Sequence, residues 1–479
     1  MRLTPSAEPA AGSGPVASIQ IEQLLAVTGG RLVGETGATA FAGATVDSRR
    51  VTPGCLFVAL PGERVDGHQF AADAARAGAA ALMVRHPIEL PPGSDAAVVV
   101  VADPLTGLQE LAAWWAGRNA ARVIGVTGST GKTIAKEMIA DVLSRTLRTL
   151  RNEGNLNSEI GLPLTLLRLE PSDEVAVLEM GMYAEGDIAR LVEIAHPEVG
   201  VVMSVHATHL ERAGSLAAIA RAKAELPAGL PRDGLAVLNL DDPRVAAMRG
   251  VTQAPVRTFG LSATAEVRAD EVESQGLAGT SFRLVTPWGN RSVHSATPGR
   301  HLIPHALAAA AVAEHFTVPL DEVVAALAAG SRAPHRMAVV AAASGAQLVD
   351  DTYNASPVSV AAALSFLAET PVTAGRRRMA VLGDMLELGP EEEQLHREVG
   401  VQAAGVLDAL VAVGARGRWI AEGARAAGLL SVALADDADD ALAVVERELD
   451  PGPGDLLLIK GSRGIALDRL VDLLAAGRN

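Results

Sequence analysis

The sequence is poor in cysteine, in aromatic residues and in positive charge. Of its 479 residues only Cys55 is a cysteine, and 3% are phenylalanine, tryptophan or tyrosine. A single cysteine excludes both an internal disulfide framework and a cage of thiolate ligands around a metal. The scarcity of aromatic side chains predicts cores built from aliphatic residues.

The formal net charge is −15. Such a chain would not neutralise the phosphates of a nucleic acid or of an anionic membrane surface, so we expect neither as a partner. A small anionic substrate stays compatible with this charge, provided that basic residues gather locally around it.

Long apolar runs are also missing. No run approaches the ~18 residues that span a bilayer, and the stretch 96–102 (AAVVVVA) has the length of a strand. Residues 1–17 are rich in Ala, Pro, Ser and Gly and lack the apolar segment of a signal peptide, so we expect a disordered tail. These features favour a cytoplasmic protein without membrane insertion.

Short Val/Leu runs alternate with Ala-rich amphipathic segments along most of the chain. The clearest runs are 175–180, 199–205, 235–240, 379–384 and 455–461. Strands that alternate with helices predict an α/β fold with mostly parallel sheets, in which ligands bind at the carboxyl ends of strands.

At ~100–200 residues per domain the length predicts two to four domains. A strand that ends near residue 101 and a Gly/Pro break at 330–337 suggest two boundaries. We therefore expect domains at 18–103, 104–333 and 334–479 after the tail.

The stretch VIGVTGSTGKTIAKEM (123–138) places a Gly-rich turn between a predicted strand and a predicted helix. Glycines let backbone N–H groups approach phosphate, Lys132 can reach the β- and γ-phosphates, and the Thr133 hydroxyl can bind Mg²⁺. The strict phosphate-loop pattern has glycine where Val126 stands, so an ordinary Gly-rich turn is the alternative. The residues expected to bind nucleotide here are Thr127, Gly128, Ser129, Thr130, Gly131, Lys132 and Thr133.

Three further positions carry side chains suited to a metal or a phosphate. Glu179 follows a strand, where a hard carboxylate oxygen could bind Mg²⁺ or form a structural ion pair. His206 and His209 follow another strand, and either could bind metal or be an exposed loop residue. Lys223 lies on a predicted helix and, taken alone, reads as a surface lysine.

Together these segments resemble the Mur ligase superfamily, the ATP-dependent amino-acid and peptide ligases of peptidoglycan synthesis. In the first domain the likeness lies in 46–84 (VDSRRVTPGCLFVALPGERVDGH…). The central domain contributes GNLNSEIGLPLTLL (154–167), EMGM, HLERAGS, AKAE and VLNLDDP. The third contributes HRM, VDDTYNASP (349–357), AVLGDMLELG and IKGSRG.

The resemblance implies a small N-terminal α/β domain that holds a UDP-sugar, a central phosphate-loop ATPase domain and a Rossmann-like C-terminal domain. The motifs at 155–167, 350–357 and 381–389 resemble the member that joins D-alanyl-D-alanine to UDP-N-acetylmuramoyl-tripeptide through an acyl phosphate, which implies these two substrates, ATP and Mg²⁺. Such ligases often work as monomers, and the oligomeric state stays open. The third residue of the tripeptide is not specified.

The resemblance further implies a catalytic set of Lys132, Lys223, His209 and Arg336. Mg²⁺ would be held by Thr133 and Glu179, with His209 at a second metal. Lys223 stands where the superfamily often carries a carbamylated lysine, and a plain lysine that contacts phosphate is the alternative. In the C-terminal domain Arg336 would close on the nucleotide, or be a surface arginine, and Asp351 would bind the ribose.

Substrate contacts are implied in the same way. Ser48 and Arg49 would contact the UDP-sugar, while Asp47 could brace Arg49. Arginine suits a carboxylate through two parallel hydrogen bonds, so the basic turn at 460–463 would bind the dipeptide, unless it is a solvated turn. The remaining implied contacts are Asn157 and Ser158 for the UDP-linked peptide, and Asn354, Lys460, Ser462 and Arg463 for D-alanyl-D-alanine.

The sequence departs from the family pattern where adenine binds. The family commonly shows G-x-H-N-x-x-N-A-L-A-A, whereas 299–309 reads GRHLIPHALAA, with Leu302 and His305 in place of the asparagines. We expect His305 to contact ATP by stacking or by a hydrogen bond set by its tautomer. Two alternative functions stay open: a superfamily ligase that adds a single amino acid, or glutamate to folate, and a non-catalytic relative that binds nucleotide or UDP-sugar.

Overall fold

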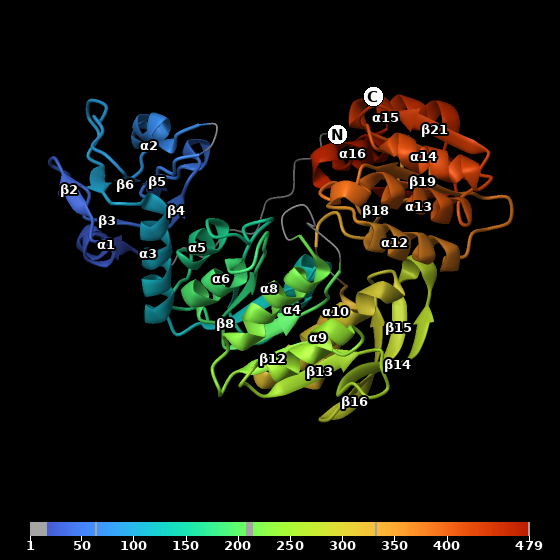
Figure 1. Cartoon of the computed structure of the whole chain (residues 1–479), viewed down its shortest axis with the longest axis horizontal. Coiled ribbons are helices and arrows are strands. Elements are labelled where there is room, and N and C mark those ends of the chain that lie inside the picture. The colour runs from blue at the N-terminus through green and yellow to red at the C-terminus, as the bar shows by residue number, and fades with distance from the viewer. Residues whose placement is uncertain (1–16, 63–64, 207–213, 331–332, 478–479) are drawn as a thin grey trace, which may run out of the picture. The chain divides into compact units, whose positions relative to one another are not determined.

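The computed structural model describes residues 17–62, 65–206, 214–330 and 333–477 (Figure 1). The tail predicted at 1–17 lies outside these residues, apart from residue 17. The chain forms two compact units. The first comprises Met1–Arg122, Asn152–Ala176 and Glu193–His196, and the second comprises Val123–Arg151, Val177–Val192 and Pro197–Asn479.

The first unit contains a five-stranded sheet in the order β2-β7-β6-β5-β4 and a two-stranded ribbon, β1-β3. The five-stranded sheet is parallel except for β2, which runs antiparallel to β7. The strands are β1 (Ile19–Gln20), β2 (Arg31–Val33), β3 (Ala40–Phe41), β4 (Ala44–Thr45), β5 (Leu56–Val58), β6 (Ala81–Val84) and β7 (Ala97–Val100). The helices are α1 (Ile21–Thr28), α2 (Ala71–Arg76), α3 (Pro104–Arg118) and α5 (Gly161–Leu166).

Small residues let helix α2 lie close to this sheet. Ala71, Ala74 and Ala75 of α2 pack in one cluster with Phe57 and Leu82 from the strands. Helix α3 begins where Asp103 accepts a hydrogen bond from the N–H of Thr106, which satisfies one of the free donors of its first turn. This cluster is aliphatic except for Phe57, which is close to what the composition predicts.

The second unit holds a nine-stranded sheet in the order β16-β15-β14-β13-β12-β11-β8-β10-β9. Pairing is parallel from β8 through β11, β12 and β13 to β14, and antiparallel from β14 to β16. The strands are β8 (Arg122–Thr127), β9 (Thr149–Arg151), β10 (Val175–Glu179), β11 (Val199–Val202), β12 (Leu235–Asn239), β13 (Val256–Gly260), β14 (Val267–Ser274), β15 (Thr280–Thr286) and β16 (Gly289–Ser295). Its helices are α4 (Lys132–Leu143), α6 (Asp187–Ala195), α8 (Leu216–Ala228), α9 (Pro243–Ala246), α10 (Ile303–His315) and α11 (Leu320–Ala328).

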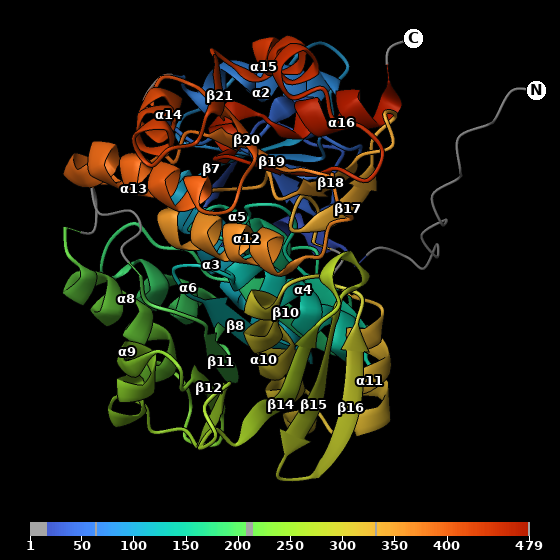
Figure 2. The ribbon, with the colours of Figure 1, turned by 90° about the vertical axis from the view of Figure 1, so that its right-hand side faces the viewer.

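The same unit holds a six-stranded sheet in the order β17-β18-β22-β19-β20-β21, parallel except for β17. The strands are β17 (Ala338–Ala341), β18 (Gln347–Asp350), β19 (Arg378–Gly383), β20 (Ala409–Val413), β21 (Ser431–Ala435) and β22 (Leu456–Lys460). Alternate strand residues face α15 (Ala438–Val444) and α16 (Asp468–Ala476), which pack on one side in a shared aliphatic cluster. Figure 2 shows α12 (Pro357–Glu369), α13 (Glu392–Ala404) and α14 (Gly417–Ala426) on the other side.

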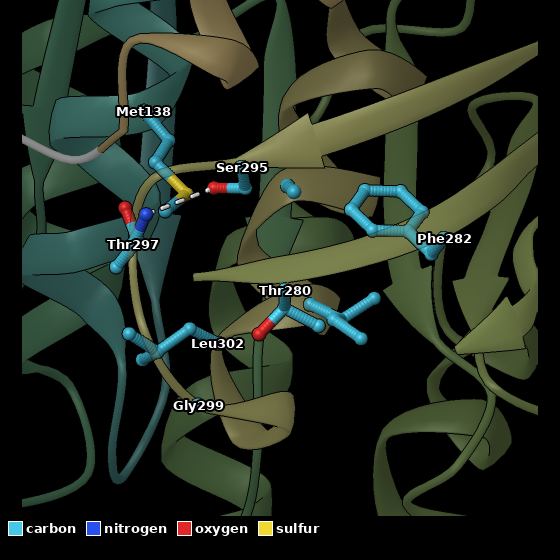
Figure 3. A pocket seen from close by; sticks show the side chains of 9 residues that line it. Met138, Thr280, Phe282, Ser295, Thr297, Gly299 and Leu302 are labelled. Atoms are coloured by element: carbon cyan, nitrogen blue, oxygen red, sulfur yellow. Dashed lines mark hydrogen bonds between the residues drawn. The ribbon is translucent and has the colours of Figure 1, made fainter. Parts of the chain in front are cut away.

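A small cavity of about 10 Å³ lies among β15, β16, α4 and the segment that enters α10 (Figure 3). Three hydroxyl-bearing residues, Thr280, Ser295 and Thr297, line it together with apolar side chains such as Met138 and Phe282. The Ser295 hydroxyl accepts a hydrogen bond from the N–H of Thr297 at 3.3 Å. The buried Thr280 hydroxyl has no hydrogen-bond partner among the described residues.

The prediction of an α/β fold with mostly parallel sheets is confirmed. The domain boundaries at 103/104 and 333/334 stay predictions. In the described part of the chain, no helix combines the length and the apolar character that a bilayer crossing requires.

Candidate active site

The Gly-rich loop lies between β8 and α4, where the sequence predicts it. Thr127 ends the strand and donates its hydroxyl hydrogen to the carbonyl of Met180 at 2.9 Å. Gly131 caps α4 with φ of 80°, a backbone conformation that favours glycine. A Cβ atom at Gly131 would also collide with the ring of His305. This position therefore requires glycine for two independent reasons.

The loop is attached to the end of the neighbouring strand β11. The N–H of Ser129 donates to the carbonyl of Ser204 at 2.8 Å, and the N–H of Thr130 donates to the Ser204 hydroxyl at 3.1 Å. The Ser129 hydroxyl donates to the carbonyl of His206 and accepts from its N–H, both at 2.9 Å. These bonds fix the loop before any ligand arrives, and they occupy two of its backbone donors.

Lys132 lies in the first turn of α4. Its ammonium group donates to the carbonyl of Gly128 at 2.8 Å and approaches the carbonyl of Ser129 at 3.5 Å. The first N–H groups of a helix have no partner inside the helix, and the helix dipole is positive at this end. The loop therefore presents an ammonium group and helix donors together, which suits an anion.

Thr133, Glu179 and Arg336 form a buried contact. The Thr133 hydroxyl donates to Oε2 of Glu179 at 2.8 Å and accepts from Nη2 of Arg336 at 3.0 Å. Arg336 is 203 residues distant from Thr133 in the sequence. Its Nε is buried and has no hydrogen-bond partner among the described residues. A buried donor without a partner indicates a group that an incoming acceptor could satisfy.

Two lysines, half-buried Lys132 and buried Lys223, face the same carboxylate. Burial lowers the pKa of Lys132, which Arg336 lowers further, whereas Glu179 raises it. Lys223, which is 3% exposed on α8, has a pKa well below the usual lysine value, because of burial first and the Lys132 charge second. Three basic groups therefore surround one carboxylate, an arrangement that a polyanion such as a triphosphate would neutralise.

Thr133 and Glu179 also fit a magnesium ion. Their oxygen atoms converge at 2.8 Å at the foot of the loop. Magnesium is held in proteins by one or two hard oxygen ligands together with substrate phosphates. The donor set of these two residues therefore suits Mg²⁺ beside a bound nucleotide.

A second group of predicted residues lies at the ends of β18 and β22. The ammonium group of Lys460 donates to Oδ2 of Asp351 at 2.5 Å and to the carbonyl of Asn354 at 2.9 Å. Lys460 is 2% exposed, and burial lowers its pKa while Asp351 raises it. The structure therefore pairs Asp351, predicted to bind the ribose, with Lys460, predicted to bind the dipeptide.

The basic turn after β22 divides into a buried and an exposed part. The Ser462 hydroxyl is buried and accepts from the N–H of Leu386 at 3.0 Å, so it fixes the turn. Arg463 is exposed, with its guanidinium carbon 5.2 Å from the ring centroid of Tyr353. In this turn Ser462 is buried, whereas the Arg463 side chain is exposed and could bind a carboxylate.

Two histidines in and before helix α10 are held neutral by burial. The pKa of His305 is lowered to about 3, because of burial first and then the neighbouring His301. Its Nδ1 lies 3.2 Å from the carbonyl of Leu302, which requires the proton on Nδ1 and leaves Nε2 as an acceptor towards Gly131. His301 has its pKa lowered to about 4, again by burial. His305 thus packs against the phosphate loop, and its contact with adenine stays a prediction.

The predicted UDP-sugar contacts lie in the first unit. Arg49 is exposed and forms a two-bond pair with Asp47, Nε to Oδ1 at 2.9 Å and Nη2 to Oδ2 at 2.8 Å. This pairing, with the Arg49 N–H as a further donor, lowers the pKa of Asp47 to about 2. The Ser158 hydroxyl accepts from the N–H of Ile160 at 3.4 Å and from the N–H of Gly161, the first residue of α5, at 3.3 Å, and Asn157 precedes it.

His209 lies outside the described residues, so its predicted role at a second metal stays a prediction. Two residues of the site were not predicted. Ser204 anchors the Gly-rich phosphate loop. Tyr353 contacts Arg336, which precedes β17, and Arg463, which follows β22. Tyr353 lies inside the motif 349–357, between the predicted site residues Asp351 and Asn354. This position in the sequence could have indicated that Tyr353 belongs to the site.

Comparison with known proteins shows the family to which the chain belongs. Family models match at 41–114 (Mur ligase family, catalytic domain), 126–313 (Mur ligase middle domain) and 335–463 (Mur ligase, glutamate ligase domain). The chain belongs to the Mur ligase family. The predicted family is therefore confirmed.

One Mur ligase relative is the UDP-N-acetylmuramoyl-tripeptide–D-alanyl-D-alanine ligase of Escherichia coli (strain K12). It is 38% identical over 461 residues, which cover 95% of this chain and 98% of the relative. A crystal structure of MurF from Acinetobacter baumannii superposes with a TM-score of 0.85 at 30% identity, covering 97% and 100% of the two chains. MurF from Thermotoga maritima, solved in complex with ADP, gives 0.78 at 28% identity, with 91% and 97% covered. These Mur ligase structures confirm the predicted three-domain α/β class.

Proposed function

We propose that this chain joins D-alanyl-D-alanine to UDP-N-acetylmuramoyl-tripeptide with consumption of ATP, the step that completes the pentapeptide precursor of peptidoglycan. The observation that carries the proposal is the cluster of half-buried Lys132 and Arg336 and buried Lys223 around the buried Glu179 and Thr133. The Escherichia coli relative bears the name of this activity.

The chemistry explains why buried positive charge is needed. A carboxylate oxygen of the tripeptide attacks the γ-phosphorus of ATP, ADP leaves, and an acyl phosphate forms. The amine of the dipeptide then attacks the acyl carbon, the nitrogen loses a proton, and inorganic phosphate leaves. The first step brings two anions together, and cations lower that repulsion most strongly in a site with little water.

Each residue of the cluster has a place in this scheme. Lys132 and Arg336 contact the β- and γ-phosphates. Thr133 and Glu179 hold Mg²⁺, which supplies further neutralisation of phosphate charge when bound. His209 serves a second metal ion. Asp351 binds the ribose, and His305 contacts the nucleotide.

Lys223 is proposed to carry a carbamate. Burial favours its neutral amine, which is the form that attacks carbon dioxide with loss of a proton. The product is an anionic oxygen ligand, which would lessen the excess of cations around Glu179. Growth of a ¹³C carbamate resonance in wild-type protein with labelled bicarbonate, absent from Lys223→Met, would support this assignment, and identical spectra would contradict it.

The remaining contacts are proposed on the substrate side. Ser48, Arg49, Asn157 and Ser158 bind the UDP-linked tripeptide. The dipeptide is bound by the C-terminal loops, through Asn354, Lys460, Ser462 and Arg463. The enzyme acts as a monomer in the cytoplasm, where ATP and UDP-linked precursors occur.

Product mass spectrometry tests the proposal. Wild-type protein with Mg-ATP, UDP-N-acetylmuramoyl-tripeptide and D-alanyl-D-alanine should yield the UDP-linked pentapeptide and one phosphate per product. Lys132→Ala should lose turnover and still bind the UDP-sugar substrate, because the lysine serves only the phosphates. Turnover with a single amino acid or a folate instead of the dipeptide would indicate another ligase. Binding of nucleotide without turnover on any acceptor would indicate a non-catalytic relative.

A further inference from the structure

The ring of Tyr353 lies next to two guanidinium groups. The guanidinium carbon of Arg336 lies 4.2 Å from the ring centroid, and that of Arg463 lies 5.2 Å from it. Both distances are inside the ~6 Å range over which an aromatic face attracts a cation. One ring thus contacts an arginine from each of two chain segments.

The sheet explains why these three residues meet. Strand β17 runs antiparallel to β18, with Ala338 opposite Asp350, while β22 runs parallel to β18, with Asp350 opposite Ile459. The residues before β17 and those after β18 and β22 therefore lie at the same end of the sheet. The N–H of Tyr353 donates to the carbonyl of His335 at 3.1 Å, which fixes the ring beside Arg336.

The backbone around Arg336 is constrained as well. Its two neighbours, His335 and Met337, both have positive φ, 57° and 54°. Non-glycine residues in this region are strained and persist only where their surroundings hold them. From this position Arg336 also donates from Nη2 to the Thr133 hydroxyl at 3.0 Å. A single guanidinium thus contacts both the Tyr353 ring and the phosphate loop.

We propose that Tyr353 is a positioning residue for the ligation. Its ring holds Arg336 towards the phosphates and Arg463 towards the carboxylate of the dipeptide, so that the acyl donor and the amine meet in a fixed geometry. This inference rests on the proposed function. The ring acts through its negative π face, which attracts each guanidinium group.

Two substitutions distinguish the contribution of the Tyr353 ring from that of its hydroxyl group. Tyr353→Phe keeps the π face, and its kcat/KM should stay within about twofold of wild type. Tyr353→Leu keeps apolar bulk without the π face. Its kcat/KM should fall roughly 5- to 30-fold, the range that two cation–π contacts predict when one arginine is half-buried and the other exposed. The KM values for ATP and for the dipeptide should both rise, because one arginine faces each substrate.

Trp288→Leu is the matched control. Arg257 lies 5.0 Å from the Trp288 ring at the β15–β16 turn, so this variant removes the same kind of pair outside the C-terminal loops. Its kinetics should match wild type. Melting temperatures for all three variants should show that the Tyr353→Leu protein stays folded at the assay temperature.

Several outcomes would overturn the inference. They are a Tyr353→Leu enzyme with wild-type kinetics, a Tyr353→Phe enzyme as impaired as the leucine variant, or a change in kcat with both KM values unchanged. The wild-type reaction is measured first, because its absence would refute the proposed ligase activity instead. In that case calorimetry of ADP binding tests the part of the inference that concerns Arg336 and the nucleotide. Tyr353→Leu should weaken ADP binding, and an unchanged ADP affinity would refute this part of the inference.

Discussion

The buried pair of Lys460 and Asp351 allows a quantitative test of the C-terminal site. Lys460 is 2% exposed and Asp351 8% exposed, so neither charge is solvated when its partner is removed. We consider Lys460→Met, which removes the cation, Asp351→Asn, which removes the anion, and the double variant. A matched surface control is Arg447→Met, because the pair of Arg447 with Glu448 is exposed.

The expected magnitudes follow from burial. Removing one partner of a buried ion pair leaves the other charge uncompensated and costs roughly 3–5 kcal/mol. Removing both charges leaves no buried ion, so the double variant should lose only about 0–2 kcal/mol. The surface control should change by less than about 1 kcal/mol. The two single losses together would reach roughly 6–10 kcal/mol, so the cycle predicts strong coupling between the sites.

Calorimetric melting without nucleotide measures these losses. For a domain of this size 1 kcal/mol shifts the melting temperature by about 2–4 °C, so each single variant should melt about 6–20 °C lower. The double variant should recover most of that loss while remaining inactive, because both side chains are proposed to contact substrate. Additive losses in the double variant would refute the pairing, as would a single variant that melts like wild type.

Three further outcomes are expected. Gly131→Ala should abolish binding of a non-hydrolysable ATP analogue in calorimetry, because the left-handed backbone and the His305 ring both exclude a methyl group; unchanged affinity would contradict this geometry. Thr280→Val should raise the free energy of unfolding by about 1 kcal/mol in urea titration, because it removes an unpaired buried hydroxyl, whereas a loss would indicate that the hydroxyl has a partner. The pKa of His305 is about 3 in the folded protein against an ordinary 6.5, so the unfolded chain binds the proton first and stability should fall as pH drops from about 6.5 towards 3. His305→Gln should flatten that decline in melting curves between pH 7.5 and 4.5, and an unchanged slope would count against the assignment.

The sequence carried the local features of the site. The valine-rich runs predicted strands that the structure contains at 175–179, 199–202, 235–239 and 456–460. The Gly-Lys-Thr turn predicted a phosphate loop because its backbone geometry depends on residues within a few positions of each other. Gly131 and Lys132 act through the conformation of a few neighbouring residues, and such local structure can be predicted from a short stretch of sequence.

Long-range pairings could not be predicted in the same way. Lys460 and Asp351 were each expected to face a substrate, yet they bind each other across 109 residues. Which way a loop side chain points depends on the register of β18 against β22, and neither strand encodes that register alone. The sequence also could not predict that the antiparallel strands β15 and β16 extend the nine-stranded sheet. A strand joins a sheet at an edge that the other strands leave unpaired, and this depends on the whole sheet.

The carbonyl acceptors of the phosphate loop bear on the end of the catalytic cycle. Lys132 reaches the Gly128 carbonyl at 2.8 Å. When inorganic phosphate departs, the ammonium group can donate to this carbonyl instead of being left without an acceptor. Product release then exchanges one hydrogen-bond acceptor of Lys132 for another.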